Sequence, residues 1–490
     1  MALPLTHIIN TSIATGQFPT QWKKGKITPL YKKGSRTKKE NYRPVALLSC
    51  AGMILERCIA IQIEEYMEKN NFLSEFQFGF RKGKSCVSEM LTLMDGLLEA
   101  KEEKKEILLV LYDLSSAFDT INHDTLLEKL KVYGFDSHSR GWIESYLKNR
   151  VQTVSVAGKL SSELQIQIGT PQGSRLSPLL FICLMADMNL WVNESSLSNF
   201  ADDTQSIIVA KDQNTAIEVT KREANSIIDY FSSNDLVNNP DKACLVYNSR
   251  GKGEKITISD IGGEDLESLD PKKSERLLGL QLSPHLNWDE HVSEISVVLN
   301  KRMGLLRRIK KRVPTDKLLI VAENIFNAKI RYGIAVYLQP TFEKEDVKAQ
   351  KLSANTKSLQ TLQNTMLRTV FGFRQEKQVN MTKLRERIKM MSVNQMNVYH
   401  VLLEVFNVLH NGSSEQIRSK WMDKGNSEYP LRNKEKELRV PERPSKKCIG
   451  FTYCGAKLYN TLPDHIKDIT KPEPYKTKIK EWIWNTIPPY

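Results

Sequence analysis

"SNFADDTQSIIVA", residues 198–210, places two adjacent acids, Asp202 and Asp203, between short apolar runs. Aspartate favours tight turns, so the stretch predicts a β-hairpin with the acids at its bend. The alternative is metal chemistry, because carboxylates are the ligands that hard divalent cations prefer. For this pattern alone the turn is favoured, since such short patterns recur by chance. The rest of the sequence has to decide between the two interpretations.

A third acid, Asp113, ends the apolar run "EILLVLYD" at residues 106–113. The run predicts a buried strand with this aspartate at its C-terminal edge. If that strand lies beside the hairpin, Asp113 and Asp202 converge, and two nearby anions repel each other unless a cation lies between them. A pair of Mg²⁺ ions about 3.5–4 Å apart would resolve the repulsion and suits in-line attack on a phosphate.

The surrounding segments alternate strands with helices. Residues 123–135 predict a helix with Asp124 as its candidate N-cap, and "RVQTVSVAGKLSSELQIQIGT", residues 150–170, predicts a hairpin. "GTPQGSRLSPLLFICL" follows from residue 169 and predicts a stiff loop, then a long apolar helix from Ser177 or Pro178. This alternation predicts an α+β sheet domain with helices on one face.

The composition is that of a globular protein with a phosphate-bearing partner. The 490 residues suggest two to four domains, and the formal net charge of +14 suits nucleic acid. None of the seven cysteines forms a C-x-x-C pair, so neither a zinc knuckle nor a disulfide framework is expected, and the compartment is expected to be reducing. There is no basic n-region of a signal peptide and no apolar run of the ~18 residues that a membrane span needs.

The positive charge is concentrated in two tracts. Residues 22–43 contain nine Lys or Arg and one acid, and glycine and proline within them predict short strands and turns. Residues 300–312 contain seven basic residues and no acid, on a predicted amphipathic helix that presents Arg302, Arg308 and Lys311 or their neighbours. One such tract alone indicates a solvated face. Two tracts flanking an acidic motif favour a groove that grips a nucleic-acid backbone in a salt-sensitive way.

Three motifs together resemble the palm of reverse transcriptases: "LVLYDLSSAFDTINHDTLL", "GTPQGSRLSPLLF" and "FADDT". The resemblance is close to the non-LTR retrotransposon group, the LINE-like and jockey-like elements. It extends to "WKKGKITPLYKKGSRTKKENYRPVALLS" as the fingers, to "RLLGLQLSPHLNWDEHV" and "LQTLQNTMLRTVFGF" after the acidic hairpin, and to "GFTYCGAKLYNTLPDHIKDI" near the C-terminus. Nearly the whole chain is therefore covered.

The resemblance implies a right-hand polymerase fold of the α+β class. Its parts are fingers at 1–104, with parts of 120–185 packing nearby, a palm with an antiparallel sheet at 105–290, a helical thumb at 291–375, and a mainly helical C-terminal region at 376–490 to which no role is assigned.

The activity implied is that of an RNA-directed DNA polymerase, a nucleotidyltransferase that extends a primer 3′-hydroxyl with dNTPs. Its partners would be an RNA template and a DNA primer or target DNA, and its cofactor two Mg²⁺ ions, with Mn²⁺ able to substitute. An intracellular location, in the nucleus, the cytoplasm or both, is expected. Relatives commonly carry an endonuclease before the polymerase; here the fingers begin almost at Met1, so a fragment lacking the endonuclease is expected. No pattern indicates an oligomeric state.

Two alternatives stay open. A decayed or domesticated copy could bind nucleic acid without polymerising. A group II intron-type maturase shares the palm, although that family usually has Tyr where this chain has Phe200.

The same resemblance implies roles for residues at the acidic centre. Asp113 and Asp202 would be the principal ligands of both metals, helped by the backbone carbonyl of Leu114, with Asp203 a weaker ligand. Phe118 would lie under the sugar and exclude a 2′-hydroxyl; its alternative is a place in the core, where aromatic residues usually lie. Asp119 is expected to play a structural part.

Other residues match the nucleotide-binding positions of the family. Gln172 and Gly173 would cradle the incoming nucleotide and template base, where a β-carbon would block close backbone approach. Arg43, with Lys32 or its neighbour Lys33, would grip the phosphates. Lys242 resembles a general acid that protonates pyrophosphate; a lone lysine near a turn is more often solvated.

Overall fold

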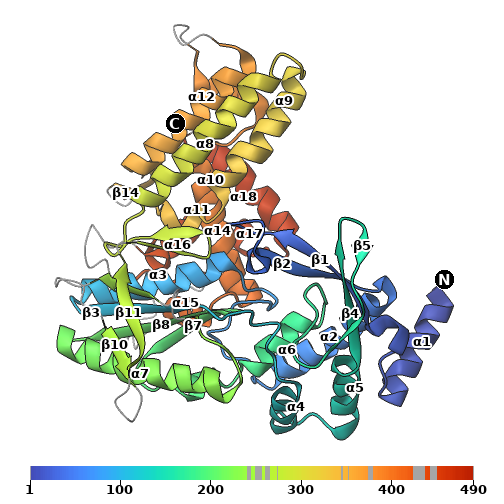
Figure 1. Ribbon diagram of the computed structural model, residues 1–490. Coiled ribbons are helices and arrows are strands. Elements are labelled where there is room, and N and C mark those ends of the chain that lie inside the picture. The colour runs from blue at the N-terminus through green and yellow to red at the C-terminus, as the bar shows by residue number, and fades with distance from the viewer. Residues whose placement is uncertain are drawn as a thin grey trace.

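A six-stranded sheet carries both of the acidic strand ends that the sequence singles out (Figure 1). Its order is β10 (Ile256–Ser259), β11 (Asp265–Lys272), β9 (Cys244–Asn248), β3 (Glu106–Tyr112), β8 (Asp203–Ala210) and β7 (Ser196–Phe200). β3 lies between β8 and β9 and is antiparallel to both. The predicted strand that ends at Asp113 is therefore a direct neighbour of the hairpin that carries Asp202.

The computed structural model describes residues 2–239, 244–248, 256–259, 265–272, 274–340, 342–343, 346–350, 352–373, 379–422, 436–441 and 450–488. Within these ranges, none of the helices combines the length and the apolar composition that crossing a bilayer requires.

Strand β3 is buried on both faces. Its residues 107, 109 and 111 belong to one hydrophobic core and residues 108, 110 and 112 to another. Helix α3 (Cys86–Glu102) packs on the first face and helix α7 (Gln213–Ser233) on the second. The prediction of helices on one face only is therefore wrong. The apolar run of this strand is continuous rather than alternating, which is the pattern of a strand covered on both sides.

A second sheet joins the first basic tract to the predicted hairpin at 150–170. Its order is β2 (Tyr42–Leu47), β1 (Lys24–Tyr31), β4 (Arg150–Val156) and β5 (Lys159–Leu160), with β6 (Leu164–Ile166) also paired to β4. β1 is antiparallel to β2 and parallel to β4. Around this sheet lie α1 (Ala2–Thr15), α2 (Cys50–Lys69), α4 (His123–Val132) and α5 (Ser137–Leu147), with short 3₁₀ turns at Thr20–Lys23 and Lys39–Asn41 (Figure 1).

Two helices near the centre differ from the prediction at their ends. The N-cap of α4 is Asn122, not Asp124, because the Asn122 side chain accepts hydrogen bonds from the backbone N–H groups of Asp124 and Thr125. Helix α6 (Ser177–Leu184) begins at Ser177 as predicted but is only eight residues long, and a 3₁₀ turn at Met188–Leu190 follows. Almost the whole of the apolar run is buried, so its composition gives no signal of where the helix ends.

A helical bundle stands above the six-stranded sheet (Figure 1). It contains α8 (Asp289–Ile309), α9 (Thr315–Ala322), a π-helical turn (Glu323–Asn327), α10 (Ala328–Arg331), α11 (Ile334–Tyr337) and α12 (Ala354–Phe371). Short hairpins precede and interrupt it: β12 (Glu275–Leu277) with β13 (Leu280–Leu282), and β14 (Phe342–Glu343) with β15 (Asp346–Gln350). The amphipathic helix predicted for the second basic tract is confirmed, since Val292, Ile295, Leu299 and Leu306 are buried in α8.

The C-terminal helices share one core with this bundle and with α3. They are α13 (Met381–Ile388), α14 (Val393–Asn411), α15 (Glu415–Met422), α16 (Phe451–Asn460), α17 (Asp464–Lys467) and α18 (Pro472–Thr486). α14 packs against α11, α12, α16 and α18, and α16 also contacts α3. One hydrophobic cluster includes side chains from α3, β3, α8, α12, α14, α16 and α18. These helices are therefore not a separately packed appendage.

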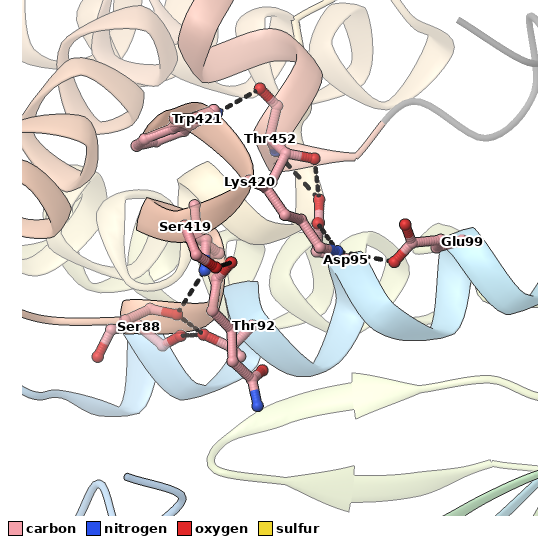
Figure 2. A network of polar contacts seen from close by, with 11 residues as sticks. Ser88, Thr92, Asp95, Glu99, Ser419, Lys420, Trp421 and Thr452 are labelled. Carbon is pink, nitrogen blue, oxygen red and sulfur yellow. Dashed lines mark hydrogen bonds and ion pairs between the residues drawn. The ribbon is translucent and has the colours of Figure 1, made fainter. Parts of the chain in front are cut away.

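A polar network fixes the C-terminal helices on α3 (Figure 2). The Asp95 carboxylate, 5% exposed, accepts the backbone N–H of Thr452 at 3.0 Å and its hydroxyl at 2.7 Å. Lys420 Nζ lies 3.3 Å from Asp95 and 2.7 Å from Glu99. The indole N–H of Trp421 donates to the Thr452 carbonyl at 2.8 Å. A buried charge is tolerated when it is paired and hydrogen-bonded. The two partners of the Asp95 carboxylate, Lys420 and Thr452, lie 325 and 357 residues away in the sequence.

Candidate active site

The hairpin with acids at its bend is confirmed. Phe200 pairs with Asp203, so Ala201 and Asp202 form a two-residue loop and Asp203 is the first residue of β8. Ala201 has φ +59°, the left-handed region that hairpin loops of this length usually give to Gly, Asn or Asp. A residue other than these in that region is held there by its surroundings.

The ladder between β3 and β8 brings the acids together. Tyr112 pairs with Thr204 at its end. One residue further, Asp113 on one strand lies across from Asp203 on the other, and Asp202 follows in the loop. Asp113 and Asp202 are half-buried and Asp203 is exposed. Asp202 and Asp203 follow Asp113 by 89 and 90 positions in the sequence, yet all three lie at one end of the sheet.

These side chains suit a divalent cation by their chemistry. Within the described ranges, no group of three or more His, Cys, Asp or Glu residues forms a complete metal cage. Mg²⁺ does not need such a cage, because it is usually held by one or two carboxylates and by substrate phosphates and water. The backbone on either side of Leu114 is fixed by a β-bridge between Leu114 and Asn238. In its two hydrogen bonds, Asn239 N–H donates to the Asp113 carbonyl at 2.9 Å and Ser115 N–H donates to the Val237 carbonyl at 2.8 Å. Neither bond uses the Leu114 carbonyl.

Phe118 is half-buried, at the boundary between the core and the surface. Its ring packs on Phe181 at 5.1 Å between centroids, and on Phe80 at 6.2 Å with the rings nearly perpendicular. The Phe118 carbonyl accepts the N–H of Thr170 at 2.8 Å, which ties this turn to the "GTPQGS" loop. Phe80 is 50% exposed and was not singled out by the sequence analysis.

The loop around Gln172 joins β2 of the second sheet to the turn that follows β3. The Gln172 side-chain amide donates to both carboxylate oxygens of Asp119, at 2.9 and 2.8 Å, and its backbone carbonyl accepts the N–H of Ala46 in β2 at 2.8 Å. Gly173 has φ +117°, and a β-carbon there would lie 3.0 Å from the Ala46 carbonyl oxygen. Burial raises the pKa of Asp119, and the hydrogen bond from Gln172 opposes that rise. The Asp119 carboxylate thus has a structural contact, and its partner lies on the loop that carries Gln172.

The strand register relates the two candidate phosphate-gripping cations. Leu30 pairs with Arg43, and the Lys32 N–H donates to the Asn41 carbonyl at 2.7 Å, so the pairing continues beyond β1. Because side chains alternate along a strand, Lys32 lies on the same face as Arg43 and Lys33 on the opposite face. Of the two alternatives, this register favours Lys32.

The three cations predicted on the basic helix do not share one environment. Arg308 is exposed and its Nε donates to Gly304 of its own helix at 3.4 Å, and Lys311 is exposed beyond the end of α8. Arg302 is half-buried and donates to the Ile325 carbonyl, so the prediction that it lies freely on the solvent face is wrong. Its long side chain reaches the neighbouring π-helical turn, a contact that helical spacing cannot reveal. Lys242 lies outside the described residues.

The sequence analysis missed the segment that supports the acidic hairpin, residues 74–89. Gln77 accepts the N–H of Ala201, the first residue of the hairpin loop, at 3.0 Å. Glu89 accepts the Ser198 hydroxyl of β7 at 2.9 Å, and burial raises its pKa to about 8. The available signal was a glycine between two aromatic residues, in "QFGFRKGK", directly before three cations.

Comparison with known proteins agrees with this arrangement. Residues 30–282, more than half of the chain, match the protein family described as reverse transcriptase (RNA-dependent DNA polymerase). The probable RNA-directed DNA polymerase from transposon BS of Drosophila melanogaster is 29% identical over 327 residues, which cover 64% of this chain and 35% of that protein. The RNA-directed DNA polymerase from mobile element jockey of the same species is 26% identical over 344 residues, 68% of this chain and 37% of that protein. The predicted resemblance to jockey-like elements is confirmed.

One further curated relative and one solved structure are similar to the chain over more than three quarters of its length. The probable polymerase from transposon X-element of Drosophila melanogaster is 26% identical over 383 residues, 76% of this chain and 40% of that protein. Among solved structures, telomerase from Candida albicans is similar with a TM-score of 0.42 and 11% identity, over 79% of this chain and 68% of that one. The aligned part of the chain thus spans well under half the length of the curated relatives.

Proposed function

The chain belongs to the reverse transcriptase family, and on this premise we propose that it extends the 3′-hydroxyl of a DNA primer with deoxynucleotides copied from an RNA template. The observation that carries the proposal is the antiparallel pairing of β3 with β8, which brings Asp113 beside Asp202 and Asp203. Paired carboxylates at one strand edge, with a basic hairpin and a basic helix in the same chain, suit a phosphoryl-transfer site for nucleic acid.

The fold divides on this proposal into the parts of a right hand. Residues 1–104 are the fingers, together with β4, which pairs with β1, and with β5 and β6, which pair with β4. The six-stranded sheet belongs to a palm at 105–290 and the bundle at 291–375 is the thumb. Residues 376–490 then brace the thumb against α3, as their shared core and the Asp95 contacts support.

Reverse transcriptases use divalent metals, and we assign two Mg²⁺ ions, replaceable by Mn²⁺, to Asp113, Asp202 and Asp203 with the Leu114 carbonyl. When bound, such ions lower the pKa of the primer hydroxyl and neutralise charge that builds on the leaving pyrophosphate. The task of the chain itself is to hold these carboxylates at one edge of the sheet despite their mutual repulsion.

The remaining residues bind the nucleotide. Arg43 and Lys32, on one face of the basic hairpin, grip the triphosphate by charge-assisted hydrogen bonds. Gln172 and Gly173 line the position of the base, and Asp119 orients the Gln172 amide. Lys242 keeps its proposed part as the proton donor to pyrophosphate. The exposed cations Arg308 and Lys311 contact the nucleic-acid backbone, with Arg302 supporting them from its half-buried position.

Primer extension tests this function directly. The purified chain is given an RNA template, a labelled DNA primer, deoxynucleotides and Mg²⁺, and the expected result is template-directed extension that stops when Mg²⁺ is chelated. A protein that binds the primer–template but adds no nucleotide would contradict the proposal and would fit a remnant that only binds nucleic acid.

Phe118→Ala is expected to weaken the selection of deoxynucleotides over ribonucleotides. Removing the ring would free space for a 2′-hydroxyl, so the ratio of kcat/KM for ribonucleotides to that for deoxynucleotides should rise roughly 10- to 100-fold. Phe135→Ala, a half-buried aromatic that packs on Tyr66 away from the acidic hairpin, is the matched control and should leave the ratio unchanged. An unchanged ratio in a folded Phe118→Ala protein would contradict this role and leave Phe118 as a residue that only packs in the core.

A further inference from the structure

Gln77 holds the tip of the acidic hairpin. Its side chain is 5% exposed, and its Oε1 accepts two backbone N–H groups, that of Gly79 at 2.8 Å and that of Ala201 at 3.0 Å. The second bond reaches across 124 positions of sequence to the loop residue directly before Asp202. A buried side-chain oxygen that accepts a backbone N–H from each of two segments holds the two segments together, because buried polar groups need hydrogen-bond partners.

The backbone around Gln77 follows the hairpin closely. Phe78 donates its N–H to the Asn199 carbonyl at 2.7 Å, and Asn199 donates its own to the Phe76 carbonyl at 2.9 Å. A β-carbon on Gly79 would clash with the Ala201 nitrogen at 2.2 Å, so only glycine fits at this position. Residues 76–79 therefore pair with the end of β7 and contact the hairpin loop directly.

The Gln77 backbone is itself anchored. The Arg81 guanidinium donates to the carbonyls of Ser74 and Gln77, at 2.5 and 3.2 Å, and makes two bonds to the Glu68 carboxylate, at 2.7 and 2.6 Å. Such two-point Arg–carboxylate pairs restrict geometry as well as adding energy. The support thus runs from helix α2 through Arg81 and Gln77 to the hairpin loop.

The loop needs this support because of its own conformation. Ala201 has φ +59°, a backbone conformation that is unfavourable for a residue with a β-carbon, so the loop would relax if nothing held it. Asp202 is the next residue, and a displacement of about 1 Å in a reacting group can cost ~100-fold in rate.

We propose that Gln77 is a positioning residue that sets the placement of the Asp202 carboxylate for the bound divalent cation. The inference rests on the proposed polymerase function. It adds a residue that touches neither nucleotide nor metal and acts through the backbone of Ala201.

Two substitutions distinguish the role of Gln77 as a hydrogen-bond acceptor from a role that needs only the size of its side chain. Gln77→Met keeps the length of the side chain and removes the acceptor, whereas Gln77→Glu keeps an oxygen in its place. Gln77→Met is expected to lower kcat roughly 10- to 100-fold, to leave KM for the deoxynucleotide within twofold, and to raise the Mg²⁺ concentration for half-maximal rate. Gln77→Glu should recover most of kcat. Gln62→Met, the same change on the exposed face of α2, is the control.

A second readout does not need activity. Mg²⁺ and, separately, Mn²⁺ are titrated into each protein without nucleic acid, and the rise in melting temperature is measured. Gln77→Met is expected to need more metal than the parent for the same rise, with Gln77→Glu between them. Equal kcat and equal metal response in Gln77→Met and the parent would overturn the inference, as would a Gln77→Glu protein no better than Gln77→Met.

The two proposals fail differently. A parent that extends no primer, yet responds to metal more strongly than Gln77→Met, overturns the polymerase function and keeps the positioning part. A parent that neither extends a primer nor responds to metal overturns both.

Discussion

Replacing Asp113 or Asp202 by asparagine is expected to lower primer extension about 1,000-fold or more, equivalent to about 4 kcal/mol of transition-state stabilisation. Asparagine keeps the size of the side chain but removes the charge that holds a divalent cation. Asp203→Asn is expected to have a smaller effect, since that residue is exposed and is the weaker predicted ligand. The measurement is single-turnover extension on a primer–template at saturating Mg²⁺.

The fold of these variants should not suffer. Removing one of several neighbouring anions relieves repulsion, so melting temperatures measured with a chelator should equal or slightly exceed that of the parent. The stabilisation by added Mg²⁺ should shrink. Asp124→Asn, at an exposed position that the site does not use, is the control. Activity within tenfold of the parent in both Asp113→Asn and Asp202→Asn would show that the paired strands do not form the catalytic centre.

Gly83→Ala is expected to destabilise the protein by about 3 kcal/mol or more. Gly83 has φ +82°, which costs a residue with a β-carbon about 1–2 kcal/mol. The added carbon would also lie 2.1 Å from the backbone carbonyl oxygen of Asn411, at the end of α14. A backbone oxygen cannot move aside as a flexible side chain can, so the C-terminal helices would have to shift away from the segment before α3.

A glycine on α3 itself supplies the matched control. Gly96 is exposed within the helix, and nothing lies within 4 Å of the position its β-carbon would take. Gly96→Ala should therefore stabilise the protein by about 0.5–1 kcal/mol, because alanine loses less backbone entropy than glycine. Thermal unfolding of the two variants and the parent gives the comparison. Equal stability of Gly83→Ala and the parent would mean that the C-terminal helices do not dock as described.

The sequence was sufficient where the signal is local. The apolar run before Asp113, the hairpin bend at Asp202 and the helix that begins at Ser177 each follow from a few consecutive residues, and all three are observed. Asp113 and Asp202 come together only if their two strands are neighbours in the sheet. No local sequence pattern shows that they are. The resemblance to a known family supplied that condition in advance.

The errors concern side chains whose environment comes from distant segments. Arg302 was expected at the surface because its helix is amphipathic, but the π-helical turn at 323–327 lies within reach of its guanidinium. Gln77 was missed because a glutamine carries no charge pattern, and its two acceptor bonds become visible only when residue 201 is placed beside it.

The Asp95–Thr452 contact has a consequence for synthesis on the ribosome. The two residues are 357 positions apart, so at 5–20 residues per second roughly 20–70 s separate their emergence. During that interval, α3 has already formed one side of the shared core while α16, which packs on it, has not been translated. Until then, the apolar surface of α3 that α16 covers in the folded protein is exposed, and such transiently exposed surface favours aggregation.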